Sequence, residues 1–176
     1  RILTAEEMAK TMREVSVAEF FEKNRHLLGY ENTTKALITI VKELVDNSLD
    51  AADEAGILPE IKVQIKEVGP DRFRIISEDN GPGVVAEKVP FAFGSLLYGS
   101  KFHRLRQSRG TQGIGVSGAI LFSQLTTGKH AKILSSTGKA IHEFELGIDV
   151  AKNQPHTFSQ KEQKNPDKWH GIRIEM

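Results

Sequence analysis

Residues 42–51 read Lys-Glu-Leu-Val-Asp-Asn-Ser-Leu-Asp-Ala and lie inside a helical pattern that organises the whole chain. Apolar or small residues recur at helical spacing on one side of this segment, and a glycine followed by a proline ends it. The sequence therefore predicts one long amphipathic helix. Its predicted apolar side consists of Leu37, Ile40, Val41, Leu44, Ser48, Ala51 and Ala55, and its stop signal is Gly56 with Pro59.

Acidic and amide side chains recur beside this apolar side. Glu43 and Asn47 are four residues apart, so they are neighbours on the helix surface, and Asp50 and Glu54 continue the row. A carboxylate and an amide oxygen that face the same point make a candidate nucleotide site. The alternative is an ordinary solvated edge, because the shoulder of any amphipathic helix carries its first charges.

Short elements are predicted on both sides of the long helix. Two capping boxes, Thr4 to Glu7 and Ser16 to Glu19, predict two short helices before it. Alternating apolar residues predict a hairpin over residues 60–78, and a turn follows at Asp79-Asn-Gly-Pro-Gly. A second apolar helix is predicted from about Ser117 to Gly128.

The C-terminal half is predicted to finish the sheet. A hairpin is expected over residues 131–146, and a last strand over 171–176. Residues 151–169 are polar and contain two prolines, so they are predicted to form a loop. This order of elements predicts an α+β fold, with helices on one face of a largely antiparallel sheet.

Composition limits the classes of function. The chain has 176 residues and 39% hydrophobic content, enough for one core. The net charge of +1 gives no global reason to expect nucleic acid or an anionic membrane. No cysteine is present, and the six histidines lack metal-ligand spacing, so thiolate zinc sites and disulfides are excluded.

The apolar runs of the sequence indicate where in the cell the protein lies, and its two ends indicate whether it is part of a longer protein. No run approaches the roughly 20 apolar residues that span a bilayer, and no signal-peptide core is present, so we expect a cytoplasmic protein without a membrane partner. The chain begins at Arg1 and ends at Met176 directly after a strand-like run. We therefore expect it to be a piece of a longer protein.

Residues 79–83, Asp-Asn-Gly-Pro-Gly, allow two interpretations. They are common turn residues, and a plain turn is one interpretation. In the other, Asp79 accepts a hydrogen bond from an exocyclic amine and Gly83 lets a flat base approach the backbone. A carboxylate acceptor would select adenine over guanine, which has a carbonyl acceptor at that position.

Residues 109–118, Arg-Gly-Thr-Gln-Gly-Ile-Gly-Val-Ser-Gly, lead into the second helix and suit phosphate binding through backbone amides. An ordinary flexible connection is the alternative. The order of glycines is not that of a Rossmann site, and Gly94–Lys101 misses the P-loop pattern because Ser100 precedes Lys101. The basic run from Lys101 to Arg109 could hold a nucleotide, contact nucleic acid or be solvated.

Taken in order, three motifs resemble the ATP-binding signature of the gyrase, heat-shock chaperone, histidine kinase and MutL (GHKL) superfamily. They are Glu43-x-x-x-Asn47-x-x-Asp50-Ala51, Asp79-x-Gly81-x-Gly83 and Gly110-x-x-Gly113-x-Gly115. Within that superfamily, residues 16–24, 97–103 and 107–115 are similar to the B subunits of archaeal DNA topoisomerase VI. The resemblance implies a two-layer α/β sandwich of the Bergerat type, with ATP and Mg²⁺ between the long helix and a lid.

The resemblance also implies roles for particular residues. It makes Glu43 the base that activates water, Asn47 the Mg²⁺ ligand and Asp79 the carboxylate that reads adenine. The residues that would hold the triphosphate are Ser100, Lys101, Gly110, Thr111, Gln112, Gly113, Ile114, Gly115, Val116 and Ser117.

On this resemblance, residues 1–24 form an N-terminal helical strap and residues 25–176 the ATP-binding domain. The Phe20-Phe21 pair of the strap is expected to be exposed and to need a partner surface. Helix-two-turn-helix and transducer domains, with a lysine for the γ-phosphate, are expected beyond the chain. The implied partners are a DNA-cleaving A subunit, a second copy upon ATP binding and double-stranded DNA, at the nucleoid.

One departure and two rival functions accompany this resemblance. Members commonly carry Gly-Thr on the late strand, where this chain has Gly171-Ile172, so a hydroxyl near the adenine contact is missing or supplied elsewhere. A MutL-like mismatch-repair ATPase would share the first motif, but the glycine-rich segment differs from that family. A non-enzymatic binding module would require loss of Glu43 or Asn47, and both are present.

Overall fold

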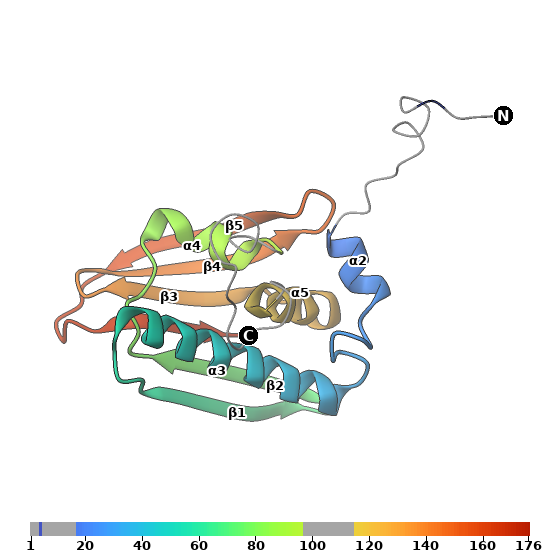
Figure 1. Cartoon of the computed structure of the whole chain (residues 1–176), viewed down its shortest axis with the longest axis horizontal. Coiled ribbons are helices and arrows are strands. Elements are labelled where there is room, and N and C mark those ends of the chain that lie inside the picture. Colours follow the sequence, from blue (N-terminus) through green and yellow to red (C-terminus); the bar gives the residue numbers. More distant parts are fainter. Residues whose placement is uncertain (1–3, 5–16, 97–114) are drawn as a thin grey trace.

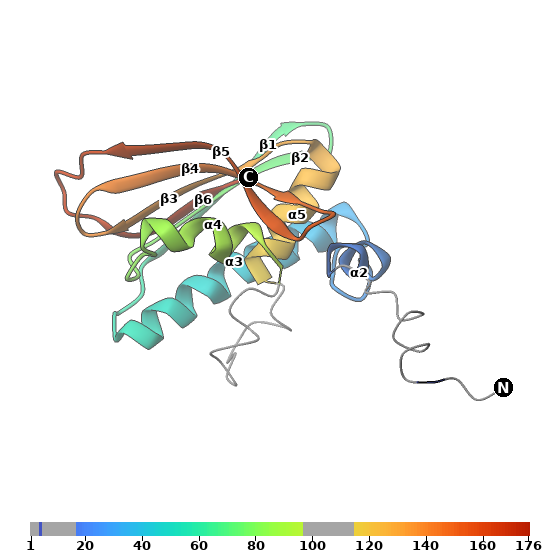
Figure 2. The ribbon, with the colours of Figure 1, turned by 90° about the horizontal axis from the view of Figure 1, so that it is seen from above.

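Six strands form one sheet, and the helices of the described chain lie on one of its faces (Figures 1 and 2). The computed structural model describes Thr4 and residues 17–96 and 115–176. The helices are α2 (Val17–Lys23), α3 (Thr33–Ala55), the 3₁₀ turn η1 (Ala86–Lys88), α4 (Val89–Gly94) and α5 (Gly115–Thr127). The strands are β1 (Ile61–Gly69), β2 (Arg72–Asp79), β3 (Ala131–Thr137), β4 (Ile141–Asp149), β5 (Gln154–Gln163) and β6 (His170–Glu175).

The strand order across the sheet is β1-β2-β6-β3-β4-β5, and every described pair is antiparallel. The last strand, β6, therefore lies in the middle of the sheet between the two hairpins. Because β6 runs antiparallel to β2, this placement brings the start of β6 beside the end of β2. The predicted two-layer sandwich is confirmed.

The long helix α3 is confirmed together with its end. The side chain of Asn32 caps its start by accepting from the Lys35 N–H at 2.9 Å. Gly56, with φ of 70°, caps its end, and its N–H bonds to Ala52 O and Asp53 O. A left-handed conformation at this position suits glycine, which explains why the helix ends where the sequence predicts.

The buried side of α3 differs from the predicted one. Ala55 is exposed, whereas Glu43, predicted at the solvated shoulder, retains only 7% of its exposure. The reason is that α5 packs beside α3 and covers a flank that a lone helix on a sheet would leave in water. The buried positions of α3 are Ala36, Ile40, Glu43, Leu44, Ser48 and Ala52.

The predicted loop over residues 151–169 is wrong for its first part, because β5 occupies Gln154–Gln163. The strand is at the edge of the sheet and pairs only with β4, so most of its side chains face water and it lacks apolar alternation. Pro155 is tolerated because an edge strand leaves one row of N–H positions unpaired. Val89–Gly94 forms the short helix α4.

The remaining predicted elements are confirmed with small shifts. The two hairpins are β1 with β2 and β3 with β4, and the second apolar helix, α5, begins at Gly115, two residues before the predicted start. Residues 116–121 of α5 are all buried, since the helix lies between α3, α4 and the sheet. The helix expected after Ser16 is α2, while the one expected after Thr4 lies outside the described residues.

Tyr30 joins α2 to the core. Its ring lies 5.3 Å from that of Phe21 and 4.9 Å from that of Phe122 on α5, between centroids. Phe21 is fully buried by this packing, so the expectation that it is exposed is wrong. The Tyr30 hydroxyl is buried without a hydrogen-bond partner among the described atoms. Burial, followed by the charge of Glu43, raises the pKa of Tyr30, which keeps its hydroxyl neutral.

Because an unpaired buried hydroxyl is costly, Tyr30→Phe should raise the free energy of unfolding by about 1 kcal/mol. Urea denaturation of the chain measures this change. Tyr30→Leu is the matched control, since it also removes the hydroxyl but loses the ring packing and should destabilise the fold. A Tyr30→Phe variant less stable than the parent would show that the hydroxyl has a partner.

Candidate nucleotide-binding site

Asp79, the last residue of β2, has a buried carboxylate that three donors hold. Its Oδ1 accepts from the Gly81 N–H at 2.9 Å and from the Ile172 N–H at 3.0 Å. Its Oδ2 accepts from the Ser48 hydroxyl at 2.6 Å. The donors come from the turn after β2, from β6 and from α3, so three separate elements fix one carboxylate.

Ile172 occupies the position at which the sequence resemblance implies a threonine. Ile172 binds Asp79 through its backbone N–H, and its side chain belongs to the apolar core. A hydroxyl is nevertheless present on the carboxylate, because Ser48 supplies it from α3.

Glu43 lies on α3 and approaches the start of α5. A Cβ placed on Gly115 would be 3.5 Å from Glu43 Oε2, which brings the first residue of α5 next to the carboxylate. Gly115 has a φ of 39°, in the left-handed region. The amides at a helix start carry partial positive charge, so this position favours a carboxylate or another anion. The structure thus brings together Glu43 and Gly115, which are both predicted site residues.

Asn47 is one helical turn beyond Glu43 and is exposed. No three His, Cys, Asp or Glu side chains gather into a possible metal site within the described ranges. A single amide oxygen fits Mg²⁺ only if nucleotide phosphates and water supply the other ligands, which is the usual arrangement for this ion. Asn47 lies outside the core, and its role as a metal ligand stays a prediction.

The turn after β2 packs closely against β3. Gly83 has a φ of 73°, and a Cβ there would lie 2.0 Å from Ser136 O. Val84 N–H donates to the buried Ser135 hydroxyl at 2.9 Å. Glycine at position 83 is therefore required by contact with the protein itself. Its predicted contact with a base stays a prediction.

The start of α5 contains the last of the predicted triphosphate residues. Val116 and Ser117 are buried, and the Ser117 hydroxyl donates to Ala92 O on α4 at 3.5 Å, so their side chains pack inward. Only backbone amides of this turn are available to an anion. The predicted residues Ser100, Lys101, Gly110, Thr111, Gln112, Gly113 and Ile114 lie outside the described residues.

Sequence reasoning missed the hydrogen bonds that surround Asp79. The helical pattern places Ser48 in an apolar stripe, although a hydroxyl at a buried helix position needs a polar partner. That requirement is the signal that could have identified it. Trp169, which donates from Nε1 to Asp79 O at 3.1 Å, gave no comparable signal in the sequence.

Comparison with known proteins assigns the chain to a family. Residues 32–152 match the model of the histidine kinase-, DNA gyrase B- and HSP90-like ATPases. The chain belongs to this ATPase family. The matched range contains Glu43, Asn47, Asp79, Gly83 and the start of α5.

The B subunits of several topoisomerases are similar to this ATPase-family chain over nearly all of its length. The type 2 DNA topoisomerase 6 B subunit of Methanosarcina acetivorans is 53% identical over 98% of the chain, and that of Archaeoglobus fulgidus is 52% identical over 96%. The Pyrococcus horikoshii protein is 48% identical over 98%. The chain spans 28% of the length of the first two and 30% of the third.

The fold has a counterpart among solved structures. The 43K ATPase domain of Thermus thermophilus gyrase B, solved with an aminocoumarin, matches with a TM-score of 0.52 over 90% of this chain and 39% of its own. The sequence identity is 19%, so this likeness concerns the fold alone. None of the helices in the described ranges is both long and apolar enough to cross a membrane.

Removing the Ser48 hydroxyl should leave Asp79 Oδ2 without its donor inside the protein. We expect Ser48→Ala to lower the free energy of unfolding by about 2 kcal/mol. Thr126→Ala on α5 is the control, because that exposed hydroxyl bonds only to carbonyls of its own helix, chiefly that of Phe122, and its loss should change little. Equal stabilities of the two variants in urea denaturation would contradict the assigned bond.

Proposed function

We propose that this chain is the ATP-binding and ATP-hydrolysing domain of a type IIB DNA topoisomerase B subunit. The observation that carries the proposal is the buried Asp79 carboxylate, fixed by Ser48, Gly81 and Ile172 beside the helix that bears Glu43. The identity of about half the residues to topoisomerase 6 B subunits favours this assignment over a mismatch-repair ATPase.

Adenine recognition is the first part of the proposal. A carboxylate offers about four acceptor positions, and the described residues use three of them on Asp79. One position on Oδ2 is left for the exocyclic amine of adenine. Guanine presents a carbonyl oxygen there, and two acceptors facing each other repel, so Asp79 favours adenine.

Water activation is the second part. Glu43 is proposed as the general base that takes a proton from the water attacking the γ-phosphorus, giving ADP and phosphate. Its burial beside Gly115 keeps the carboxylate next to the helix start, where bound phosphate would lie. Residues 100–101 and 110–117 are proposed to hold the triphosphate mainly through backbone amides and Lys101.

Asn47 is proposed to ligate Mg²⁺ through its amide oxygen. The bound ion would neutralise charge on the phosphate oxygens. Asn47 is exposed and one turn from Glu43, so it can reach a ligand that Glu43 does not itself bind. In this proposal Asn47 binds the metal ion and Glu43 accepts the proton from water.

The proposed partners follow from the family likeness of the chain. They are an A subunit that cleaves DNA, a second copy of the B subunit on ATP binding, and double-stranded DNA at the nucleoid of the cytoplasm. ATP-dependent pairing of the two copies would form the gate through which a DNA segment passes. Residues 1–24 are proposed to act as the strap between the two copies, and only Thr4 and residues 17–24 of it are described.

Substitutions at Glu43 and Asn47 should separate chemistry from binding. Glu43→Ala should leave ATP affinity within a few-fold of the parent and abolish turnover, because a general base acts in the transition state. Asn47→Ala should weaken Mg-ATP binding itself. Both effects are measured by equilibrium binding and single-turnover hydrolysis in a protein of the length of the relatives.

Glu54→Ala serves as the control for this pair, since Glu54 is an exposed acidic residue on the same helix and should leave both quantities unchanged. Parental single-turnover rates in Glu43→Ala would show that Glu43 is not the base. Unchanged Mg-ATP affinity in Asn47→Ala would remove the metal role from that side chain.

A further inference from the structure

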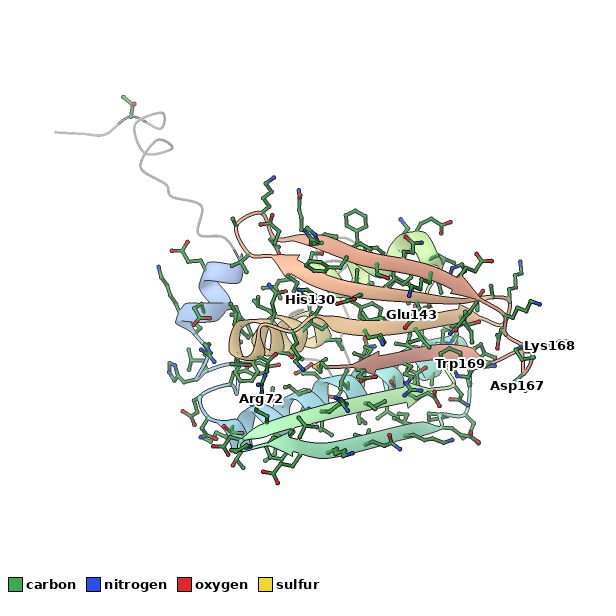
Figure 3. The ribbon with its side chains drawn as sticks, turned by 180° about the vertical axis from the view of Figure 1, so that it is seen from behind. Arg72, His130, Glu143, Asp167, Lys168 and Trp169 are labelled. Atoms are coloured by element: carbon green, nitrogen blue, oxygen red, sulfur yellow. The ribbon has the colours of Figure 1, made fainter. Side chains whose placement is uncertain are left out.

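The connection from β5 to β6 wraps round the end of β2 that carries Asp79. Trp169 Nε1 donates to the backbone oxygen of Asp79 at 3.1 Å, and His170 Nδ1 donates to Gly81 O at 2.7 Å. Figure 3 shows Trp169 in this connection at the end of the sheet, next to Lys168 and Asp167. Two consecutive side chains therefore bind the backbone of the Asp79 turn on both sides of Asn80.

Asn165 fixes this connection in place. Its Oδ1 accepts from the Trp169 N–H at 3.0 Å, and its Nδ2 donates to Trp169 O at 2.7 Å and to the Ser136 hydroxyl at 3.2 Å. Both backbone polar groups of Trp169 are thus bonded to one amide side chain, which is itself bonded to β3. The backbone that carries the indole is therefore held in place by hydrogen bonds where the indole contacts Asp79.

Gly171 brings the backbone into direct contact with Asp79. Its φ is 143°, and a Cβ at this position would lie 2.1 Å from Asp79 O. The next residue, Ile172, donates its N–H to Asp79 Oδ1. Residues 169–172 therefore hold both the main-chain oxygen and the side-chain carboxylate of the same aspartate.

We propose that Trp169 is a positioning residue for adenine recognition, which holds the main chain of Asp79 so that its carboxylate meets the base. This inference rests on the proposed adenine role of Asp79. It goes beyond that role because it assigns specificity to a residue outside the family motifs quoted above. Trp169 is the single tryptophan of the chain, so its emission reports directly on the Asp79 turn.

The hydrogen bond from Trp169 Nε1 to Asp79 O connects the indole to the residue that is proposed to bind the base. When the adenine amine bonds to Asp79 Oδ2, it changes the charge distribution of the residue whose main-chain oxygen accepts from the indole N–H. The environment of the indole N–H changes as a result. Phosphate binding alone, near the start of α5, does not touch Asp79 and leaves the indole unaffected.

The first experiment titrates the unaltered 176-residue chain, which has its own buried core, and follows tryptophan emission. ADP with Mg²⁺ should produce a saturable change whose midpoint agrees with the Kd from calorimetry. Inorganic tripolyphosphate, which lacks a base, should leave the emission unchanged when added at the concentrations at which ADP saturates it, and an equal change would overturn the inference. Calorimetric binding of ADP without an emission change would overturn the inference.

The second experiment replaces the indole. Trp169→Phe keeps an aromatic ring but loses the donor, and we expect the calorimetric Kd for ADP to rise about threefold to tenfold. Phe158→Leu is the matched control, since Phe158 is an exposed ring on β5 that stacks on His130 and should not affect ADP binding. A Kd in Trp169→Phe equal to that of the control would overturn the inference.

Asp79→Asn separates the two proposals. If it binds ADP as the parent does, the adenine role of Asp79 fails and the inference fails with it. If it weakens ADP binding while Trp169→Phe does not, the positioning role alone fails and the proposed function stands. In a protein of the relatives' length, Trp169→Phe should raise KM for ATP and leave kcat unchanged, because only ground-state positioning of the base is affected.

Discussion

The structure depends on one buried carboxylate. A carboxyl group in a protein interior needs hydrogen-bond partners, and Asp79 obtains donors from α3, from its own turn and from β6. This requirement connects the helical layer to the sheet at a defined point. β6, the last strand, lies between the two hairpins, and its residue 172 reaches the end of β2 there.

The orientation of α3 also places the other candidate site residues. Ser48 faces Asp79 in the same rotation of α3 that buries Ile40 and Leu44 in the core. With that rotation set, Glu43 lies toward the start of α5 and Asn47 remains at the rim in water. The long helix α3 therefore carries three residues of the proposed site. Ser48 holds Asp79, Asn47 is the proposed metal ligand and Glu43 is the proposed general base.

The sequence predicted those elements whose residues have a strong period of their own. The helix around residue 44 and the hairpins at 61–79 and 131–149 follow from helical or alternating patterns. The edge strand β5 has no such pattern, because water covers much of its surface. The burial of Glu43 depends on α5, which is distant in the sequence, and the bond from Trp169 to Asp79 spans 90 residues. Neither is visible in a local pattern.

The central claim is that Asp79 makes this an adenine site, and calorimetry of nucleotide binding tests it most directly. The chain should bind Mg-ATP and show no comparable binding of Mg-GTP, and Asp79→Asn should lower the affinity for Mg-ATP about 30-fold, the loss of a charge-assisted hydrogen bond of about 2 kcal/mol. Equal affinities of the unaltered chain for the two nucleotides would contradict the account.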